Sequence, residues 1–268
     1  MTWDADQIDD DAALATLEWL VELGVDTAIG DVPVDAYALP DHLAQPKAAA
    51  PPPAVAVGPA PVATAGPDPV DVARRAANSA RTLEDLRDAI IAYDLCALKR
   101  GAKNTVFADG NPRARVMIIG EAPGRDEDLQ GKPFVGRAGH LLDRMVAAIG
   151  LDRAAPDPAG AVYITNVLPW RPPGNREPEP AEIAQMLPFL TRHVELVDPD
   201  LIVLMGNAAC AAALNRRGIL RLRGEWTEAF GRPALPMTHP AYLLRQPQAK
   251  REAWADLLSI RERLDNPQ

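Results

Sequence analysis

Acidic side chains and one aromatic ring gather on residues 120–143, and side chains of these types could bind a ligand and act on it. The acidic residues are Glu121, Glu127 and Asp128, and the aromatic residue is Phe134. Glycines and prolines in the segment favour tight turns and a close approach of the backbone. A solvated acidic loop is the alternative. The apolar residues at 133–136, where loops are usually polar, favour a binding site.

The neighbouring elements predict where this segment lies in the fold. Residues 115–119 read Arg-Val-Met-Ile-Ile, an apolar run typical of a fully buried parallel strand. Apolar residues at helical spacing from 138 to 149 predict a helix. The acidic segment therefore lies at the carboxyl end of a strand, where open α/β sheets bind their ligands.

The alternation of strand and helix continues along the chain. We expect further strands at 161–166, 200–205 and 234–237, and further helices at 180–196, 206–214 and 248–264. Such repetition is typical of a parallel sheet covered by helices. The sequence therefore predicts an α/β fold, namely a three-layer α/β/α sandwich with a central four-stranded parallel sheet.

The beginning of the chain has a different composition. Apolar residues at helical spacing predict an amphipathic helix at 9–30, within an acidic helical segment that spans 1–44. Residues 45–69 are rich in proline and alanine and predict a disordered linker, and the main domain is expected at 70–268. The helix at 9–30 is too short to be stable alone, so we expect it to dock on the main domain, pack permanently with it, or bind a protein partner.

Charge is distributed unevenly along the chain. The formal net charge is −9, but residues 1–75 hold 13 acidic side chains against three basic ones, which leaves 24 acidic and 25 basic residues elsewhere. A local basic face could therefore still contact phosphates, although solvated surface charges are the alternative. Its candidate members are Arg171, Arg176, Arg216, Arg217, Arg221, Arg223 and Arg245.

Several classes of protein fit poorly. No apolar run approaches the roughly 18–20 residues of a membrane span, and the acidic start of the chain is unlike a signal peptide. Two distant cysteines suit a reducing cytoplasm and no disulfide framework, so we expect a cytoplasmic monomer. A phosphate-binding loop would need Gly-Lys-Ser or Gly-Lys-Thr, and residues 131–133 read Gly-Lys-Pro.

Four motifs carry a resemblance to a known family. Gly-Glu-Ala-Pro-Gly at 120–124, with Glu-Asp at 127–128 and Pro-Phe-Val-Gly-Arg-Ala-Gly at 133–139, resembles the first motif of the family 4 uracil-DNA glycosylases. Ile-Thr-Asn at 164–166 leads into Arg-Pro-Pro-Gly-Asn-Arg at 171–176 in the expected order, and 200–205 forms a third strand. Thr-His-Pro-Ala-Tyr-Leu-Leu-Arg at 238–245 resembles the second signature, and the likeness spans about 94–264.

The resemblance implies a DNA repair enzyme that flips uracil out of DNA and hydrolyses its N-glycosidic bond, leaving an abasic site. It implies that Phe134 stacks on the uracil ring, that Asn166 pairs with the edge of the base, and that His239 stabilises the departing anion. The uracil-binding residues it implies are Gly120, Ala122, Phe134, Asn166 and His239.

Glu121 and Glu127 are the candidate catalytic carboxylates. One would act on water while the other stabilises positive charge on the sugar, or either would organise the loop by accepting backbone N–H bonds. The resemblance also implies that Leu243, Leu244 and Arg245 form a wedge that enters the minor groove, with a simple helix start as the alternative. Arg171 and Arg176 are further candidates for contacts with DNA.

The resemblance also implies four cysteines around an iron–sulfur cluster, and here the chain departs from the family. The matching positions hold Tyr93, Cys96, Trp170 and Met186. One thiolate cannot hold a cluster that needs about four, and the histidines show no metal-ligand spacing. We therefore expect no cofactor and no metal.

The chain also lacks a histidine in the segment after the second strand, so we expect turnover rather than a covalent trap on the abasic product. The alternative function is a catalytically weak protein that binds damaged DNA, or a scaffold on the same fold.

Overall fold

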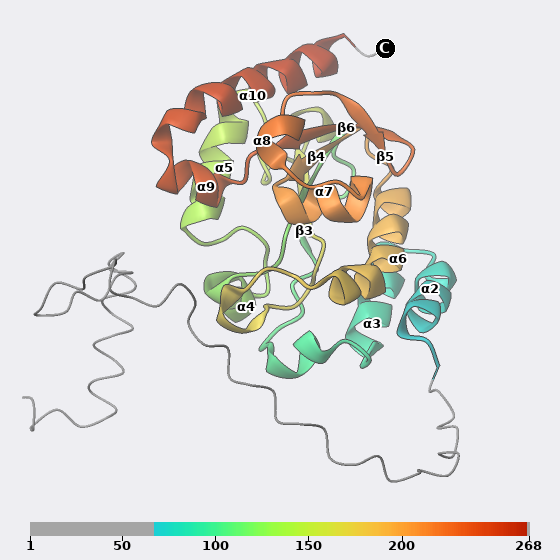
Figure 1. Cartoon of the computed structure of the whole chain (residues 1–268). Helices are drawn as coiled ribbons and strands as arrows, with labels where there is room; N and C mark the ends of the chain where they lie inside the picture. The colour runs from blue at the N-terminus through green and yellow to red at the C-terminus, as the bar shows by residue number, and fades with distance from the viewer. Residues whose placement is uncertain (1–66, 267–268) are drawn as a thin grey trace, which may run out of the picture. The chain divides into compact units, whose positions relative to one another are not determined.

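The computed structural model describes residues 67–266, which are drawn in colour in Figure 1. The predictions for the acidic segment at 1–44, and for nearly all of the linker at 45–69, lie outside the described residues. Within the described part, no helix is long and apolar enough to span a membrane.

A six-stranded sheet in the order β1-β3-β2-β4-β6-β5 forms the centre of the fold. Its strands are β1 (Ala108–Gly110), β2 (Val116–Gly120), β3 (Val162–Asn166), β4 (Leu201–Met205), β5 (Thr227–Ala229) and β6 (Arg232–Met237). The four inner strands run parallel, and each edge strand is antiparallel to its neighbour. The predicted four parallel strands are confirmed, and one short antiparallel strand extends the sheet at each edge.

Helices cover both faces of this sheet. In β2, Met117 and Ile119 contribute to one core cluster and Val116 and Ile118 to the other, because successive residues of a strand point to opposite faces. The first cluster lies under α2 (Pro69–Ser79), α3 (Leu83–Ala92), α6 (Pro180–Val197), α7 (Asn207–Leu214) and α8 (Ile219–Leu222). The second lies under α5 (Arg137–Ala147), α9 (Pro240–Arg245) and α10 (Lys250–Asp265). Figure 1 shows α5, α9 and α10 away from α2, α3 and α6, and the two core clusters on opposite faces of the sheet confirm the three-layer prediction.

Three further segments are helical. Residues 69–92 form two helices, because Thr82 and Asp85 exchange side-chain and backbone hydrogen bonds at 3.0 Å and start α3 afresh. The segment after β2 contains a short helix, α4 (Arg125–Gln130). The segment before α10 contains α9, which agrees with the helix start given as the alternative to a wedge.

The strand order brings several strand ends to one place. From β2 the chain passes to β3 on one side and then to β4 on the other side, so the direction of winding reverses next to β2. Open α/β sheets bind ligands at the carboxyl ends of strands beside such a reversal. Gly120 and Asn166 are paired in register at this edge, as the last residues of β2 and β3.

Candidate active site

A cavity of about 530 Å³ opens at the carboxyl ends of the four parallel strands. Each of these strands is followed by residues that line it, and the loop between α4 and α5 adds an aromatic ring. The lining residues include Glu121, Ala122, Phe134, Asn166, Asn207 and His239. Side chains from separate sequence motifs therefore meet in one cavity, as the resemblance implies.

Gly120, the last residue of β2, packs tightly against two residues that line the cavity. A Cβ atom at this position would lie 2.3 Å from Oδ1 of Asn166 and 2.5 Å from the ring of Phe134. No side chain fits between these two groups. Glycine at the end of β2 therefore lets the amide and the aromatic ring approach each other closely.

Phe134 is held in an unusual backbone conformation. Its φ is +53°, in the left-handed region that residues other than glycine seldom adopt, and the residue is 5 % exposed. Its ring lies 5.4 Å from the imidazole of His239, with 28° between the ring planes. A Cβ atom at Gly139 would lie 1.8 Å from the carbonyl oxygen of Phe134, so α5 can pass this close only with glycine there.

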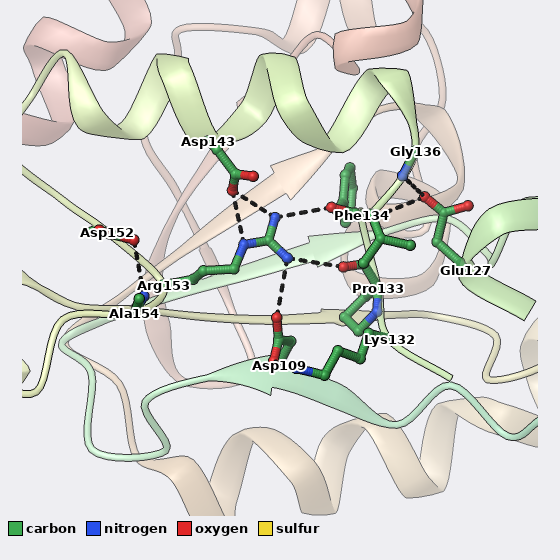
Figure 2. Close-up of polar contacts among 11 residues, drawn as sticks. Asp109, Glu127, Lys132, Pro133, Phe134, Gly136, Asp143, Asp152, Arg153 and Ala154 are labelled. Atoms are coloured by element: carbon green, nitrogen blue, oxygen red, sulfur yellow. Dashed lines mark hydrogen bonds and ion pairs between the residues drawn. The ribbon is translucent and has the colours of Figure 1, made fainter. Parts of the chain in front are cut away.

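Glu127 organises the loop that carries Phe134. Its Oε1 accepts the backbone N–H groups of Val135 at 3.0 Å and Gly136 at 2.9 Å, and its Oε2 accepts that of Gly124 at 3.1 Å. Figure 2 shows this carboxylate beside the start of α5. The sequence left open whether Glu127 takes part in catalysis or organises the loop, and these three hydrogen bonds favour the organising role.

Glu121 lies in a different environment, although it is on the same segment. Its carboxylate accepts no hydrogen bond from the described residues, and it lines the cavity. Burial raises the pKa of this carboxyl, and the nearby charge of Glu177 adds to the rise, while Arg217 lowers it. Glu121 is therefore the carboxylate available to a ligand.

Asn166 presents an unpaired polar atom to the cavity. The residue is 7 % exposed, and its buried Oδ1 has no hydrogen-bond partner among the described residues. Buried acceptors are nearly always paired in folded proteins, so an orphan in a cavity points to a ligand that supplies the donor.

His239 is held as a neutral ring with a defined donor. Its Nδ1 accepts the backbone N–H of Ala241 at 3.1 Å, so the hydrogen of the neutral imidazole lies on Nε2. Burial and, to a smaller extent, the charge of Arg245 lower the pKa of His239 to about 4, against an opposing effect of Glu127. At neutral pH the cavity therefore contains an uncharged N–H donor.

The two arginines expected at DNA lie on the loop after β3. Nε of Arg171 donates to Oδ1 of Asn175 at 2.8 Å. Arg176 donates to both carboxylate oxygens of Glu182, at 3.0 and 2.6 Å, at the start of α6. Arg176 also lines the cavity, so both arginines stay candidates for contacts with DNA.

The predicted wedge is only partly accessible. Leu243 is 1 % exposed and belongs to the core beneath α9, so its prediction as an inserting residue is wrong. It faces the core because α9 is a helix and not a loop. Leu244 is partly buried and Arg245 is exposed, so these two stay candidates for contacts with DNA.

The expected basic face is smaller than the sequence suggests. Arg223 is largely buried and donates to both oxygens of Asp256, with Nε to Oδ2 at 2.9 Å. Arg217 forms an ion pair with Glu177 at 3.2 Å, beside the cavity. Among the described residues, no shared ion pair brings the remaining candidate arginines together.

The four positions that match the cluster ligands of the family belong to the same core. The hydroxyl of Tyr93 donates to the carbonyl of Pro69 at 3.0 Å, and the indole N–H of Trp170 donates to Oγ1 of Thr105 at 3.0 Å. Met186 and Cys96 are buried beside them, and burial raises the pKa of the Cys96 thiol. One protonated thiol with three bulky side chains does not fit an iron–sulfur cluster. Among residues 67–266, no group of three or more His, Cys, Asp or Glu side chains could hold a metal ion.

Sequence reasoning missed two groups near the cavity. Glu177 lines it and contributes to the pKa of Glu121, but it lies outside the matched signature residues. Arg153 contacts the loop of Phe134 from a segment with no recognisable motif. No local signal could have identified Arg153, because its partners come from three distant parts of the sequence.

The fold and the site together define an α/β sandwich protein with a ligand cavity at the carboxyl ends of its parallel strands. The family described as the uracil DNA glycosylase superfamily matches residues 107–258. Type-4 uracil-DNA glycosylase of Archaeoglobus fulgidus is 39 % identical over 190 residues, which cover 68 % of this chain and 92 % of that protein. The type-4 enzyme of Sulfurisphaera tokodaii is 36 % identical over 191 residues, with 68 % and 84 % covered. The chain belongs to the uracil-DNA glycosylase superfamily and groups with its type-4 members.

Proposed function

We propose that this chain removes uracil from DNA by hydrolysing the N-glycosidic bond, which leaves an abasic site. The observation that carries the proposal is the unpaired Oδ1 of Asn166 in a cavity that also holds the ring of Phe134 and a neutral N–H donor on His239. A planar base with a donor on one edge and an acceptor on the other suits these three groups together.

The base must leave the double helix to reach this cavity. The glycosidic carbon is inaccessible inside a stacked duplex, and extrusion of a nucleotide costs a few kcal/mol. Stacking of the flipped base on the Phe134 ring offsets part of this extrusion cost, since base–aromatic stacking contributes about 1–3 kcal/mol. Arg245 lines the cavity and Leu244 precedes it on α9, and these two residues are the proposed contacts with the vacated stack.

Asn166 would select uracil over cytosine. Its Oδ1 accepts the N3–H of uracil and its amide donates to O4, whereas cytosine presents an acceptor at N3 and an amino group at C4. A site built from buried polar groups rejects a base that leaves those groups unpaired. The amide of Asn166 therefore supplies specificity as well as binding.

His239 would stabilise the leaving group. As the bond between C1′ and N1 breaks, its electron pair moves into the uracil ring and negative charge develops on O2. The Nε2–H of the neutral imidazole donates to this oxygen. One such donor to a developing anion contributes about 2.7–4 kcal/mol to catalysis.

Glu121 would act on the sugar side of the broken bond. Its ionised carboxylate stabilises the oxocarbenium-like sugar and accepts a proton from the water that attacks C1′. The new C–O bond replaces the C–N bond, and the departing uracil anion is finally protonated. Glu127 takes no part in this exchange, because its oxygens bind the loop backbone.

We further propose that the protein acts without an iron–sulfur cluster. The buried side chains at the four corresponding positions support this, since only Cys96 carries a thiol. The purified protein is expected to be colourless and to contain no stoichiometric iron. About four iron atoms per chain would contradict this part of the proposal.

Release of uracil from a labelled oligonucleotide tests the proposal. Strands that contain uracil, thymine or cytosine at one position are incubated with the protein, and abasic sites are cleaved with alkali. Cleavage at uracil alone is expected. Tight binding of uracil-containing DNA without release would assign the chain to damage recognition and contradict the enzymatic proposal.

A further inference from the structure

Arg153 lies in the segment between α5 and β3, and its guanidinium makes five contacts with four residues. Nε donates to Oδ1 of Asp143 at 2.8 Å, and Nη2 lies 2.7 Å from the same oxygen. Nη1 donates to the carbonyl of Pro133 at 3.0 Å and lies 3.3 Å from Oδ2 of Asp109. Nη2 also donates to the carbonyl of Phe134 at 3.0 Å. Each nitrogen of the guanidinium therefore contacts at least one protein oxygen.

The backbone around Arg153 is anchored to the start of β3. The N–H of Asp152 donates to the carbonyl of Gly160 at 2.8 Å, and the carbonyl of Asp152 accepts the N–H of Val162 at 3.2 Å. The side chain of Asp152 accepts the N–H of Ala154 at 2.9 Å. Arg153 thus extends from a fixed base, and its side chain is only 14 % exposed.

The contacts of Arg153 and Glu127 meet on the two sides of one residue. Arg153 binds the carbonyls of Pro133 and Phe134, and Glu127 binds the N–H groups of the next two residues. Figure 2 shows the guanidinium on one side of the Phe134 backbone and the carboxylate on the other. Phe134 has the left-handed φ that a phenylalanine rarely adopts, so this conformation depends on contacts that hold it.

We propose that Arg153 is a positioning residue for base recognition: with Glu127 it clamps the backbone of Phe134 and thereby fixes the height and tilt of the ring on which the base stacks. The inference rests on the proposed function for its effect on uracil. The clamp itself is a property of the loop at 133–136. Asp109 and Asp143 neutralise the guanidinium and orient its planar fork toward the two carbonyls.

Arg153→Lys tests the clamp while keeping the charge. A lysine ammonium has three donors on one atom and cannot span two carbonyls and two carboxylates at once. We expect the KM for uracil-containing DNA and the inhibition constant of free uracil to rise about tenfold, the order of change that a lost base stack produces, with a much smaller change in kcat. Arg223→Lys is the matched control, because Arg223 also pairs with a buried aspartate but lies outside the cavity.

A double-mutant cycle with Phe134→Leu separates positioning from general stability. If Arg153 acts through the ring, Arg153→Lys has no further effect on the uracil inhibition constant once the ring is gone. If the two substitutions changed the inhibition constant independently, so that their factors multiplied in the double variant, the proposal would be overturned. The proposal would also be overturned if Arg153→Lys and Arg223→Lys changed the uracil inhibition constant equally in protein that keeps Phe134.

Hydrogen exchange gives a readout that does not depend on catalysis. Arg153→Lys is expected to speed exchange of the N–H groups at 135 and 136, and Arg223→Lys is not. Unchanged exchange at these positions overturns the clamp, whereas failure of the wild-type protein to release uracil would overturn only the proposed function. If Arg153→Lys folds poorly, Asp143→Asn loosens the same guanidinium from a side chain that is 43 % exposed and must give the same exchange result.

Discussion

Glu121 and Glu127 belong to the same short segment after β2, yet their environments are opposite. Glu127 accepts three backbone N–H groups and holds the loop, whereas Glu121 accepts no hydrogen bond within the described residues and has a raised pKa. Asp128, on the same segment, resembles Glu127, because it accepts two backbone N–H groups, whereas Asn166, which lines the cavity, has an unpaired oxygen. In this part of the molecule, the satisfied carboxylates hold the loop, and Glu121 and Asn166 keep acceptors that a ligand can use.

The largest effect is expected where an unpaired donor meets the departing base. His239→Ala should lower kcat by about 10²–10³, because it removes one donor to a developing anion. Binding of uracil-containing DNA, measured by anisotropy, should change little. A variant that keeps kcat within a few-fold of wild type would place the leaving-group donor elsewhere.

Glu121→Gln should lower kcat by about 10², at the lower end of what a positioned proton acceptor contributes. The raised pKa also predicts an acidic limb in the pH profile of kcat that lies above the usual range of a glutamate, and this limb should vanish in the variant. Burial of an ionised carboxylate lowers the free energy of unfolding as pH rises through the folded pKa, so removing the charge should leave stability at neutral pH equal or higher. A marked fall in the melting temperature would show that Glu121 is structural.

Asn166→Ala should lower the rate on uracil by about tenfold and reduce the preference for uracil over cytosine, since one good hydrogen bond contributes about 1–1.5 kcal/mol. The melting temperature of this variant should fall by less than the loss of rate would suggest, because the substitution removes a buried acceptor that has no partner in the fold. The measurement compares single-turnover rates on the two bases with thermal unfolding. Full retention of discrimination would exclude Asn166 as the reader of the base edge.

Glu127→Ala should act mainly on the fold. Three hydrogen bonds to a charged acceptor are lost and partly replaced by water, so we expect a decrease of about 2 kcal/mol in the free energy of unfolding, or about 4–8 °C in melting temperature. Calorimetry checks this, with Glu177→Ala as a control whose side chain is exposed. If Glu127→Ala melts like wild type, the contrast between the two glutamates is wrong.

The sequence is sufficient to predict the parallel centre of the fold, because β2, β3 and β4 are rich in apolar residues and are buried along their whole length. The edge strands β1 and β5 have three residues each, Ala-Asp-Gly and Thr-Glu-Ala, and no apolar pattern distinguishes them from turns. The start of α9 did carry a signal, since Pro240 follows His239 as a first-turn proline follows a helix cap. That signal supports the helix start given as the alternative to a wedge, and on this helix Leu243 lies in the core.

The site residues that lie in short motifs were also predictable from the sequence, whereas the separate role of each residue was not. Which of Glu121 and Glu127 is satisfied depends on the N–H groups of residues 135 and 136, which come within reach only after the loop folds back. The position of the Arg153 guanidinium likewise depends on contacts with Asp109, Pro133 and Asp143, which lie in different parts of the fold. Contacts of this kind are set by tertiary structure and leave no periodic trace in the sequence.

The tight packing at Gly120 also limits how this cavity can change during evolution. Any larger residue at 120 would displace the amide of Asn166 or the ring of Phe134, so the floor of the cavity tolerates no variation without loss of the base site. Ala122 lines the same cavity and is partly exposed. New base preferences in descendants of this chain would therefore have to arise at the rim, at positions such as 122, while the floor is inherited unchanged.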